Sequence, residues 1–196
     1  KIIDLCAGIG MLAYAAYHRL KDHNGKAPEI TCIERNHRYV EVGKKLLPEA
    51  NWICADVFEW QQLNLGKFDW AISNPPFGKV KRFGRTGPTY KGAQFELHVM
   101  DIASELATKG TFIIPQNSAS FEYSGVQCHR RNKKGEGVKF EKQTGFRMGE
   151  SCGIDTSYYR NDWKGVSPLC EVVVIEFDEC KKQREAEEMP LLAIAA

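Results

Sequence analysis

The sequence predicts an α/β domain in which a doubly wound, mostly parallel β-sheet is covered by helices on both faces. Three observations predict it: short apolar runs alternate with segments of helical periodicity, no internal repeat occurs, and no linker divides the 196 residues. Right-handed crossovers between successive parallel strands then place helices on both faces of the sheet. A chain of this length can bury a core as one domain.

Each element follows from a local pattern. Apolar runs predict strands over residues 2–6, 29–34, 52–55, 68–73, 111–114 and 171–177. Helical spacing predicts helices over 11–20, over a segment from Tyr39 that Pro48 ends, and over 95–106. The basic, glycine-rich segment 78–92 is predicted to be a loop. Ligands of doubly wound sheets bind beyond the carboxyl ends of the strands, so the residues just after each strand are the candidates for a site.

The composition is that of an ordinary soluble domain, with 43% hydrophobic and 27% charged residues. No apolar run approaches the ~18 residues that span a bilayer, so no membrane partner is expected. The seven cysteines are odd in number and form no C-x-x-C pair, which indicates reduced thiols in the cytoplasm and no metal site. Cys6, Cys32 and Cys54 lie in apolar runs and are expected to be buried.

We expect one domain over 1–180, followed by a charged and then apolar tail over 181–196. Because a strand begins almost at Lys1, we expect the N-terminal part of this domain to be missing from the sequence.

Positive charge gathers in two stretches although the net charge is only +2. The first contains Lys79, Lys81, Arg82, Arg85 and Lys91, and the second contains His129, Arg130, Arg131, Lys133 and Lys134. Two basic stretches on a near-neutral body predict a localised anionic partner. In the first stretch, Tyr90 could stack on a nucleic-acid base.

A glycine turn follows the first strand. Gly8 and Gly10, with Ala13 in the third position, match G-x-G-x-x-G/A, in which the backbone approaches a ligand closely at a helix N-terminus. The same pattern occurs in nicotinamide and flavin enzymes. Two acids stand at equivalent places: Glu34 ends the second strand and Asp56 follows the third. A carboxylate at these places can bind ribose hydroxyls or an adenine amino group.

The most specific pattern is Asn74-Pro75-Pro76-Phe77, which follows the fourth strand. With the glycine turn, Glu34 and Asp56, this tetrad resembles the class I S-adenosylmethionine-dependent methyltransferases, and among them the amino-methylating enzymes with an N/D/S-P-P-Y/F/W motif. The resemblance covers about residues 1–115 well. It implies a Rossmann-like methyltransferase fold with a seven-stranded sheet whose last strand is antiparallel.

The resemblance also implies S-adenosylmethionine (SAM) as the cofactor and assigns roles to residues. Asp4 would support the methionine end, Glu34 the ribose hydroxyls and Asp56 the adenine. The full set of expected cofactor contacts is Asp4, Cys6, Ala7, Gly8, Gly10, Glu34, Arg35, Asp56, Val57 and Asn74. Such enzymes usually have a further cofactor-contacting segment, which can precede the glycine turn, and a target-recognition domain. Recognition could therefore be supplied by a separate domain or subunit.

The tetrad suits a planar amine as the methyl acceptor. The side-chain oxygen of Asn74 and the carbonyl of Pro75 can accept the two N–H groups of the amine, which directs its lone pair at the methyl group. The two prolines stiffen the turn, and Phe77 offers a face for a flipped base.

We therefore expect methylation of adenine N6 in DNA, with Lys79, Lys81, Arg82, Arg85, Tyr90 and Lys91 contacting the nucleic acid. Four alternatives stay open: an adenine or guanine amine in RNA, protein glutamine, a nicotinamide-dependent oxidoreductase, and a catalytically silent nucleic-acid-binding subunit.

Overall fold

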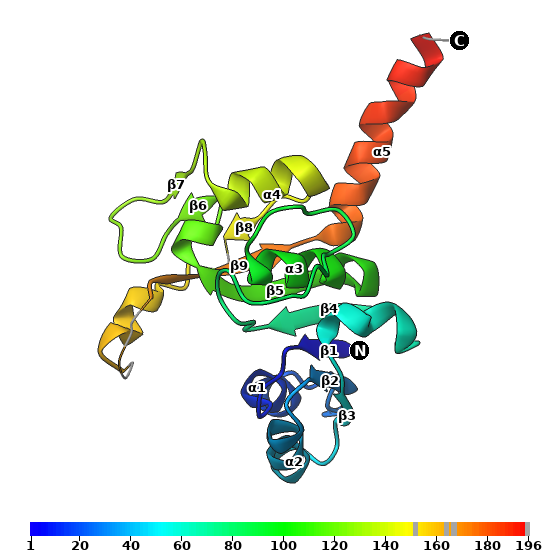
Figure 1. The fold of residues 1–196 in the computed structure, drawn as a ribbon, viewed down its shortest axis with the longest axis vertical. Helices are drawn as coiled ribbons and strands as arrows, with labels where there is room; N and C mark the ends of the chain where they lie inside the picture. The colour runs from blue at the N-terminus through cyan, green and yellow to red at the C-terminus, as the bar shows by residue number, and fades with distance from the viewer. Residues whose placement is uncertain (151–152, 163–164, 166–167, 195–196) are drawn as a thin grey trace.

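The structure, a computed structural model, describes residues 1–150, 153–162, 165 and 168–194. Its centre is a seven-stranded sheet in the order β3-β2-β1-β4-β5-β9-β8 (Figure 1). The strands are β1 (Ile2–Leu5), β2 (Ile30–Glu34), β3 (Asn51–Cys54), β4 (Phe68–Ser73), β5 (Ala107–Pro115), β8 (Gly149–Glu150) and β9 (Cys170–Ile175). The pairs from β3 to β5 are parallel, whereas β9 is antiparallel to β5 and β8. This confirms the predicted fold class, including the antiparallel last strand.

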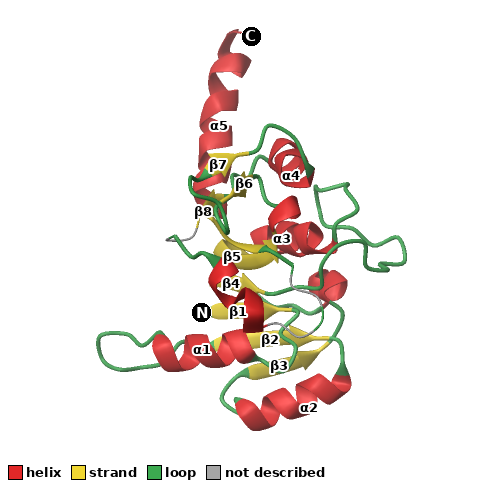
Figure 2. Cartoon of the chain, turned by 90° about the vertical axis from the view of Figure 1, so that its left-hand side faces the viewer, coloured by secondary structure: helices red, strands yellow, loops and turns green. Residues whose placement is uncertain are grey.

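Helices lie on both sides of this sheet, with α1 on one face and α3 on the other (Figure 2). The helices are α1 (Met11–Arg19), α2 (His37–Leu46), α3 (Phe95–Leu106), α4 (Glu136–Thr144) and α5 (Phe177–Ile194). Short 3₁₀ segments are η1 (Val57–Gln62), η2 (Gln116–Ser118) and η3 (Thr156–Asp162), and a small hairpin pairs β6 (Phe121–Glu122) with β7 (Arg130–Arg131). α5 projects away from the body of the molecule (Figure 1).

The alternation of side chains along each strand divides the core into two clusters, one on each face of the sheet. On β1, Ile3 and Leu5 join the larger cluster with the apolar side chains of α3, whereas Ile2 joins the smaller cluster with Ala13 and Ala16 of α1. This is the period-two pattern expected of a strand buried on both faces. The central strands are therefore fixed from both sides, and so are the loops at their carboxyl ends.

Close packing also explains a glycine within α2. The Gly43 backbone faces the ring of Trp52 on β3, and a Cβ at this position would lie 2.1 Å from the ring. The Trp52 indole donates to the Leu47 carbonyl at 3.0 Å. These contacts hold α2 against the edge of the sheet.

α5 runs through the predicted tail boundary at 180/181, which stays a prediction. Two features differ from the sequence prediction. The segment from η2 to β8 contains the β6–β7 hairpin and α4, which were not predicted. Cys54, expected to be buried, is exposed because it ends β3 at the edge of the sheet; Cys32 is buried as predicted and Cys6 is half-buried.

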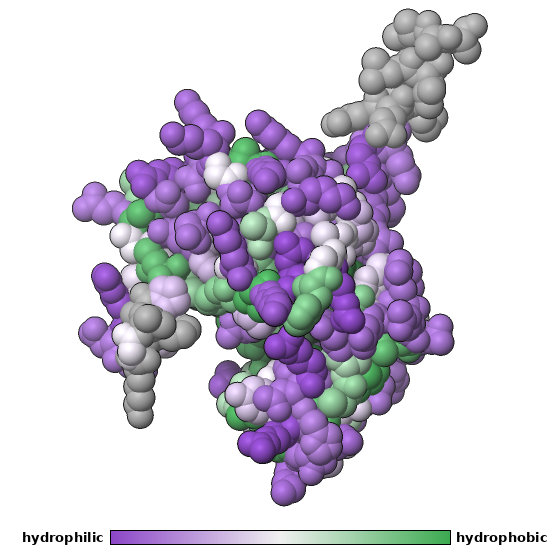
Figure 3. Space-filling model, in the orientation of Figure 1, coloured by the Kyte–Doolittle hydropathy of each residue, from purple (hydrophilic) through white to green (hydrophobic). Residues whose placement is uncertain are grey.

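The face of the molecule seen in Figure 3 is mostly hydrophilic. In the part of the chain that the structure describes, no helix is long and apolar enough to cross a membrane.

Candidate functional site

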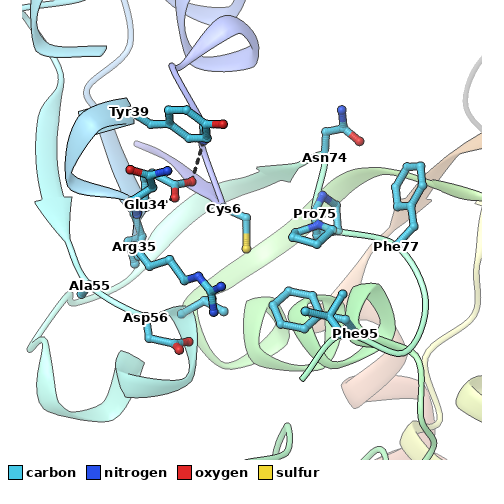
Figure 4. Close-up of a pocket in the computed structure, with 16 residues that line it drawn as sticks. Cys6, Glu34, Arg35, Tyr39, Ala55, Asp56, Asn74, Pro75, Phe77 and Phe95 are labelled. Atoms are coloured by element: carbon cyan, nitrogen blue, oxygen red, sulfur yellow. Dashed lines mark hydrogen bonds between the residues drawn. The ribbon is translucent and has the colours of Figure 1, made fainter. Parts of the chain in front are cut away.

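A pocket of about 530 Å³ opens at the carboxyl edge of the sheet, where β1, β2, β3 and β4 end. In Figure 4, Glu34, Arg35, Tyr39 and Asp56 lie on one side of the pocket, and the tetrad and Phe95 lie on the other. The lining residues are Cys6, Gly8, Ile33, Glu34, Arg35, Asn36, Tyr39, Ala55, Asp56, Val57, Asn74, Pro75, Pro76, Phe77, Val80 and Phe95.

The glycine turn brings the backbone to the wall of this pocket. Gly8 and Gly10 have positive φ values of 58° and 87°, and Cys6 has the same left-handed conformation at 63°. A Cβ on Gly8 would meet no protein atom within 4 Å, so the space beside it is open for a ligand. A side chain there would enter that space, which is the physical reason for a glycine in this turn.

Asp4 lies beneath the glycine turn and is 1% exposed. Its Oδ2 accepts the Ala13 amide at 3.2 Å at the start of α1, and its Oδ1 has no hydrogen-bond partner among the described residues. The pKa of Asp4 is raised to about 8, mainly by burial and to a lesser extent by the charge of Glu34, against the lowering by the Ala13 amide. A cationic group bound near this orphaned oxygen would stabilise the ionised form.

Glu34 stabilises the glycine turn and can still accept further hydrogen bonds. Its Oε2 accepts the Gly8 amide at 2.9 Å, and its Oε1 accepts the Asn36 amide at 2.7 Å. A carboxylate offers about four lone-pair sites, so two remain for ligand hydroxyls. Tyr39, 49% exposed in the next helix, contributes an aromatic face to the same wall.

Asp56 closes the far end of the pocket and is tied to the basic loop. Its Oδ1 accepts the Phe58 amide at 3.1 Å, which starts η1. Its Oδ2 lies 3.3 Å from the guanidinium of Arg85, which also lies 3.4 Å from Glu59. The loop 78–92 therefore reaches the side of the pocket that Asp56 lines.

The tetrad forms the opposite wall. Asn74 is exposed and Pro75 is buried, while Phe77 is half-buried. Within the described part of the chain, the Asn74 side chain makes no hydrogen bond, so its amide is free to bind a substrate. The Ser73 hydroxyl, one residue earlier, donates to the Leu5 carbonyl and anchors the end of β4 to β1.

The structure thus brings together all four residues of the tetrad with Cys6, Gly8, Glu34, Arg35, Asp56 and Val57. Asp4, Ala7 and Gly10 do not line the pocket; they support the turn from behind. Sequence reasoning missed Ile33, Asn36, Tyr39, Ala55, Val80 and Phe95. Asn36 could have been found, because it stands directly before a helix and caps it through the Arg38 amide at 3.0 Å. No group of three His, Cys, Asp or Glu side chains in the described ranges could hold a metal ion.

The basic loop 78–92 has no regular structure, as predicted, but it is anchored on α3 by buried polar side chains. His98, on α3, accepts the Gly87 amide at 2.9 Å through Nδ1 and contacts the Gly92 carbonyl at 3.0 Å through Nε2. Asp101 accepts the Thr89 and Tyr90 amides, each at 2.7 Å. Both α3 side chains are fully buried, so the loop is packed as part of the core.

The prediction that Tyr90 stacks on a base is wrong. Tyr90 is 0% exposed, and its ring packs on His98 and Phe140 with centroid distances of 4.8 and 5.6 Å. Its hydroxyl donates to Glu136 at 2.6 Å. Tyr90 is thus a core residue although its sequence neighbours are polar, because side chains of α3 and α4 pack around its ring.

The other cationic side chains of this loop differ in whether they are free to bind an anion. Arg82 donates to the carbonyls of Arg85 and Gly92, which holds the loop together. Lys91 donates to the Pro88 carbonyl at 3.2 Å. Lys79 and Lys81 are exposed, and the Lys81 ammonium lies 4.8 Å from the centre of the Phe83 ring. These two lysines are the ones best placed to meet an anion in solution.

Three members of the second basic stretch lie beside acids, whereas Lys133 and Lys134 are exposed and have no ion pair within the described residues. Arg130 pairs with Glu122, with Nη2 and Oε2 2.5 Å apart, and Arg131 pairs with Glu141 at 2.6 Å. His129 lies 2.5 Å from Glu150. The inference of a second anion-binding stretch from sequence alone is therefore weakened, because the structure gives these side chains internal partners.

Comparison with known proteins adds to this geometry. The family model for the Methyltransferase small domain matches residues 1–114. No curated protein matches the chain in sequence.

Solved structures share the fold. A proposed RNA methyltransferase from Pyrococcus horikoshii has a TM-score of 0.54 and 20% identity, covering 89% of this chain and 74% of that one. A proposed class I SAM-dependent methyltransferase from Listeria monocytogenes has a TM-score of 0.62 and 10% identity, covering 89% of this chain and 52% of that one. A modification subunit of a proposed type I restriction enzyme from Vibrio vulnificus has a TM-score of 0.58 and 10% identity, covering 90% of this chain and 40% of that one. At these identities the likeness shows the shared fold.

The anchoring of the loop by His98 predicts a loss of stability in acid. Burial, and then the nearby charge of Arg82, lowers the pKa of His98 to about 4 from 6.5, so the folded protein keeps this ring neutral. Between these two values the unfolded chain binds more protons than the folded one. The free energy of unfolding should therefore fall as pH decreases from about 6.5 to about 4, by up to ~1.4 kcal/mol per pH unit for this group.

Urea unfolding at several pH values measures this effect. His98→Gln is the matched variant, because an amide can accept from Gly87 and donate to Gly92 without titrating. Its stability should fall less steeply with acid than that of the parent. Identical slopes for the two proteins would contradict the assignment.

Proposed function

This chain belongs to the Methyltransferase small domain family, and from that premise we propose that it methylates the exocyclic N6 amine of adenine in DNA. Its cofactor is SAM. The observation that carries the proposal is the unpaired Asn74 amide, exposed on the wall of the pocket next to Pro75 and Phe77.

The pocket fits the cofactor in its chemistry. Glu34 has free acceptor sites for the ribose hydroxyls, and Asp56 stands where it can accept from the adenine amino group. Gly8 leaves open space for close approach of a ligand. The Oδ1 of Asp4 has no hydrogen-bond partner among the described residues. The cationic methionine end of SAM would favour the ionised form of this carboxyl group, whose pKa is raised in its absence.

The acceptor side is supplied by the tetrad. When bound, SAM supplies an electrophilic methyl group, so the protein has to present a nucleophile rather than activate the donor. An exocyclic amine is planar, with its lone pair delocalised into the ring. The Asn74 oxygen and the Pro75 carbonyl can accept its two N–H groups and so turn the lone pair toward the pocket. Phe77 offers its ring to a base that has left the stack.

Nucleic acid is favoured as the substrate by the exposed ammonium groups of Lys79 and Lys81, which follow the tetrad directly. The Vibrio vulnificus neighbour, a modification subunit of a restriction enzyme, supports DNA and a separate recognition subunit. The Pyrococcus horikoshii neighbour supports RNA as the alternative polyanion. Protein glutamine is a further alternative, because a planar amide suits the same tetrad.

Product analysis tests the proposed substrate. The protein is incubated with isotopically labelled SAM and with separate pools of DNA, RNA and protein, which are digested and analysed by mass spectrometry. We expect N6-methyladenine in DNA, including single-stranded DNA, in which flipping a base costs least. Methylation only of cytosine, only of RNA or only of glutamine would each refute the assignment to adenine in DNA.

Asn74→Ala should separate cofactor binding from methyl transfer. We expect the variant to bind SAM as the parent does and to lose at least ~100-fold in kcat, about 2.7 kcal/mol, because the hydrogen bond acts mainly in the transition state. Calorimetry with SAM and single-turnover kinetics measure the two effects. Asn24→Ala, in an exposed loop, is the control. A variant at position 74 with parental kcat would exclude this role.

The double variant Lys79→Ala/Lys81→Ala should weaken nucleic-acid binding. If both lysines neutralise phosphates, the slope of log affinity against log salt should decrease in magnitude by roughly 0.9 for each contact with duplex DNA. Lys44→Ala/Lys45→Ala, at the C-terminal end of α2, is the control of equal charge. An unchanged slope would show that the two lysines near the tetrad do not contact phosphate.

A further inference from the structure

We propose that Glu96 is a positioning residue for methyl transfer, and that it acts by fixing the turn that follows Asn74-Pro75-Pro76-Phe77. The inference rests on the proposed function of the tetrad. Glu96 lies in the first turn of α3, does not line the pocket and is 0% exposed. It therefore acts on the substrate only through the backbone that it holds.

The backbone in question is that of Gly78, directly after Phe77. The Gly78 amide donates to Glu96 Oε2 at 2.7 Å. The Gly78 carbonyl accepts the Phe95 amide at 2.8 Å and the Val80 amide at 3.0 Å. Gly78 has a φ of 80°, which favours glycine, and both of its polar groups are bound. The first turn of α3 therefore binds both the amide and the carbonyl of Gly78 and fixes the backbone at this position.

Glu96 is itself held between two segments that follow neighbouring strands. Its second oxygen, Oε1, accepts the Ser118 hydroxyl at 2.6 Å, and Ser118 is 1% exposed in η2 after β5. The carboxylate therefore bridges the loop after β4 and the loop after β5. Both bonds are short; the Ser118 bond is buried and the Gly78 bond is half-buried. Hydrogen bonds to a carboxylate are strong, and loss of a partner leaves a buried polar group unsatisfied at a cost in stability.

The N-terminal end of the tetrad is also fixed, through Ser73. Ser73 pairs with Phe112 in the sheet, and its hydroxyl donates to the Leu5 carbonyl. Between Ser73 and Gly78 stand four residues, two of them prolines with fixed φ. A short, stiff segment with both ends fixed has little freedom, so the acceptor oxygens of Asn74 and Pro75 are pre-oriented toward the pocket.

Release of the Gly78 end should therefore cost catalysis more than cofactor binding. Glu96→Leu removes both hydrogen bonds at nearly constant volume. We expect kcat to fall by roughly 10- to 100-fold, because a misplacement of about 1 Å can cost ~100-fold. The dissociation constant of SAM should stay within about two-fold of the parental value, because Glu34 and Asp56 are on the opposite wall.

Two further variants separate positioning from general stability. Glu96→Gln can still accept from Gly78 and can donate to a reversed Ser118 hydroxyl, so it should keep kcat within about three-fold of the parent. Glu171→Gln is the matched control. Glu171 is another buried glutamate, 1% exposed, that accepts the Tyr123 and Ser124 amides. It should lose stability while its kcat remains parental.

Hydrogen exchange at the Gly78 amide gives a readout that does not depend on activity. In Glu96→Leu this amide should exchange at least ~10-fold faster, because its acceptor is gone. If Glu96→Leu does not fold, Ser118→Ala takes its place, with smaller shifts expected in the same direction in kcat and in exchange.

The outcomes are distinct. A fall in kcat with unchanged SAM affinity, rescue by Gln and faster Gly78 exchange supports the proposal. Parental kcat in Glu96→Leu, an equal fall in Glu171→Gln, or unchanged Gly78 exchange overturns it. If the parent methylates no substrate, the proposed function fails, and the exchange experiment still decides whether Glu96 holds the turn.

Discussion

The parallel pairing of β1 with β4 is the constraint on which the site depends. The register places Asp4 opposite Ile72, and the Ser73 hydroxyl binds the Leu5 carbonyl across the pair. Two strands that are far apart in sequence therefore end side by side at the same edge of the sheet. The glycine turn leaves β1 there and the tetrad leaves β4, so the two halves of the site line one pocket. The burial of both faces of these strands prevents a shift of register that would separate the halves.

α3 has a second role beyond covering the sheet. A helix buried on nearly every side would ordinarily be apolar throughout, yet Glu96, His98 and Asp101 lie in its buried surface. Each of them accepts backbone amides of the loop 78–92, among them the buried amides of Gly87 and Tyr90, which would otherwise lack hydrogen bonds. The polar residues of α3 thus replace the secondary structure that the loop lacks. These hydrogen bonds fix the conformation of the basic loop beside the pocket.

The electrostatics of the molecule follow from the same packing. Arg85 pairs with Asp56 and Glu59, so the loop and the Asp56 side of the pocket share one ion-paired cluster. Such exposed pairs stabilise little by themselves, but they fix where the positive charge lies. In the second basic stretch, Arg130 pairs within the small hairpin and Arg131 pairs with α4. Exposed lysines without an ion pair among the described residues therefore remain in both stretches, Lys79 and Lys81 close to the tetrad and Lys133 and Lys134 after β7.

The sequence by itself determined the fold class, the strands and helices of the first half of the chain, and the residues after each strand that form the pocket. Those follow from local periodicity and from the rule that parallel strands end at one edge, so Glu34, Asp56 and Asn74 could be placed together without coordinates. The β6–β7 hairpin and α4 were not predicted, and α4 packs against η2 and α3, which are distant in the sequence. Only the tertiary structure decided that Tyr90 is a core residue, that Arg130 and Arg131 are neutralised, and that Glu96 grips Gly78. Each of these features depends on a partner residue elsewhere in the chain. The pattern of neighbouring residues in the sequence does not identify that partner.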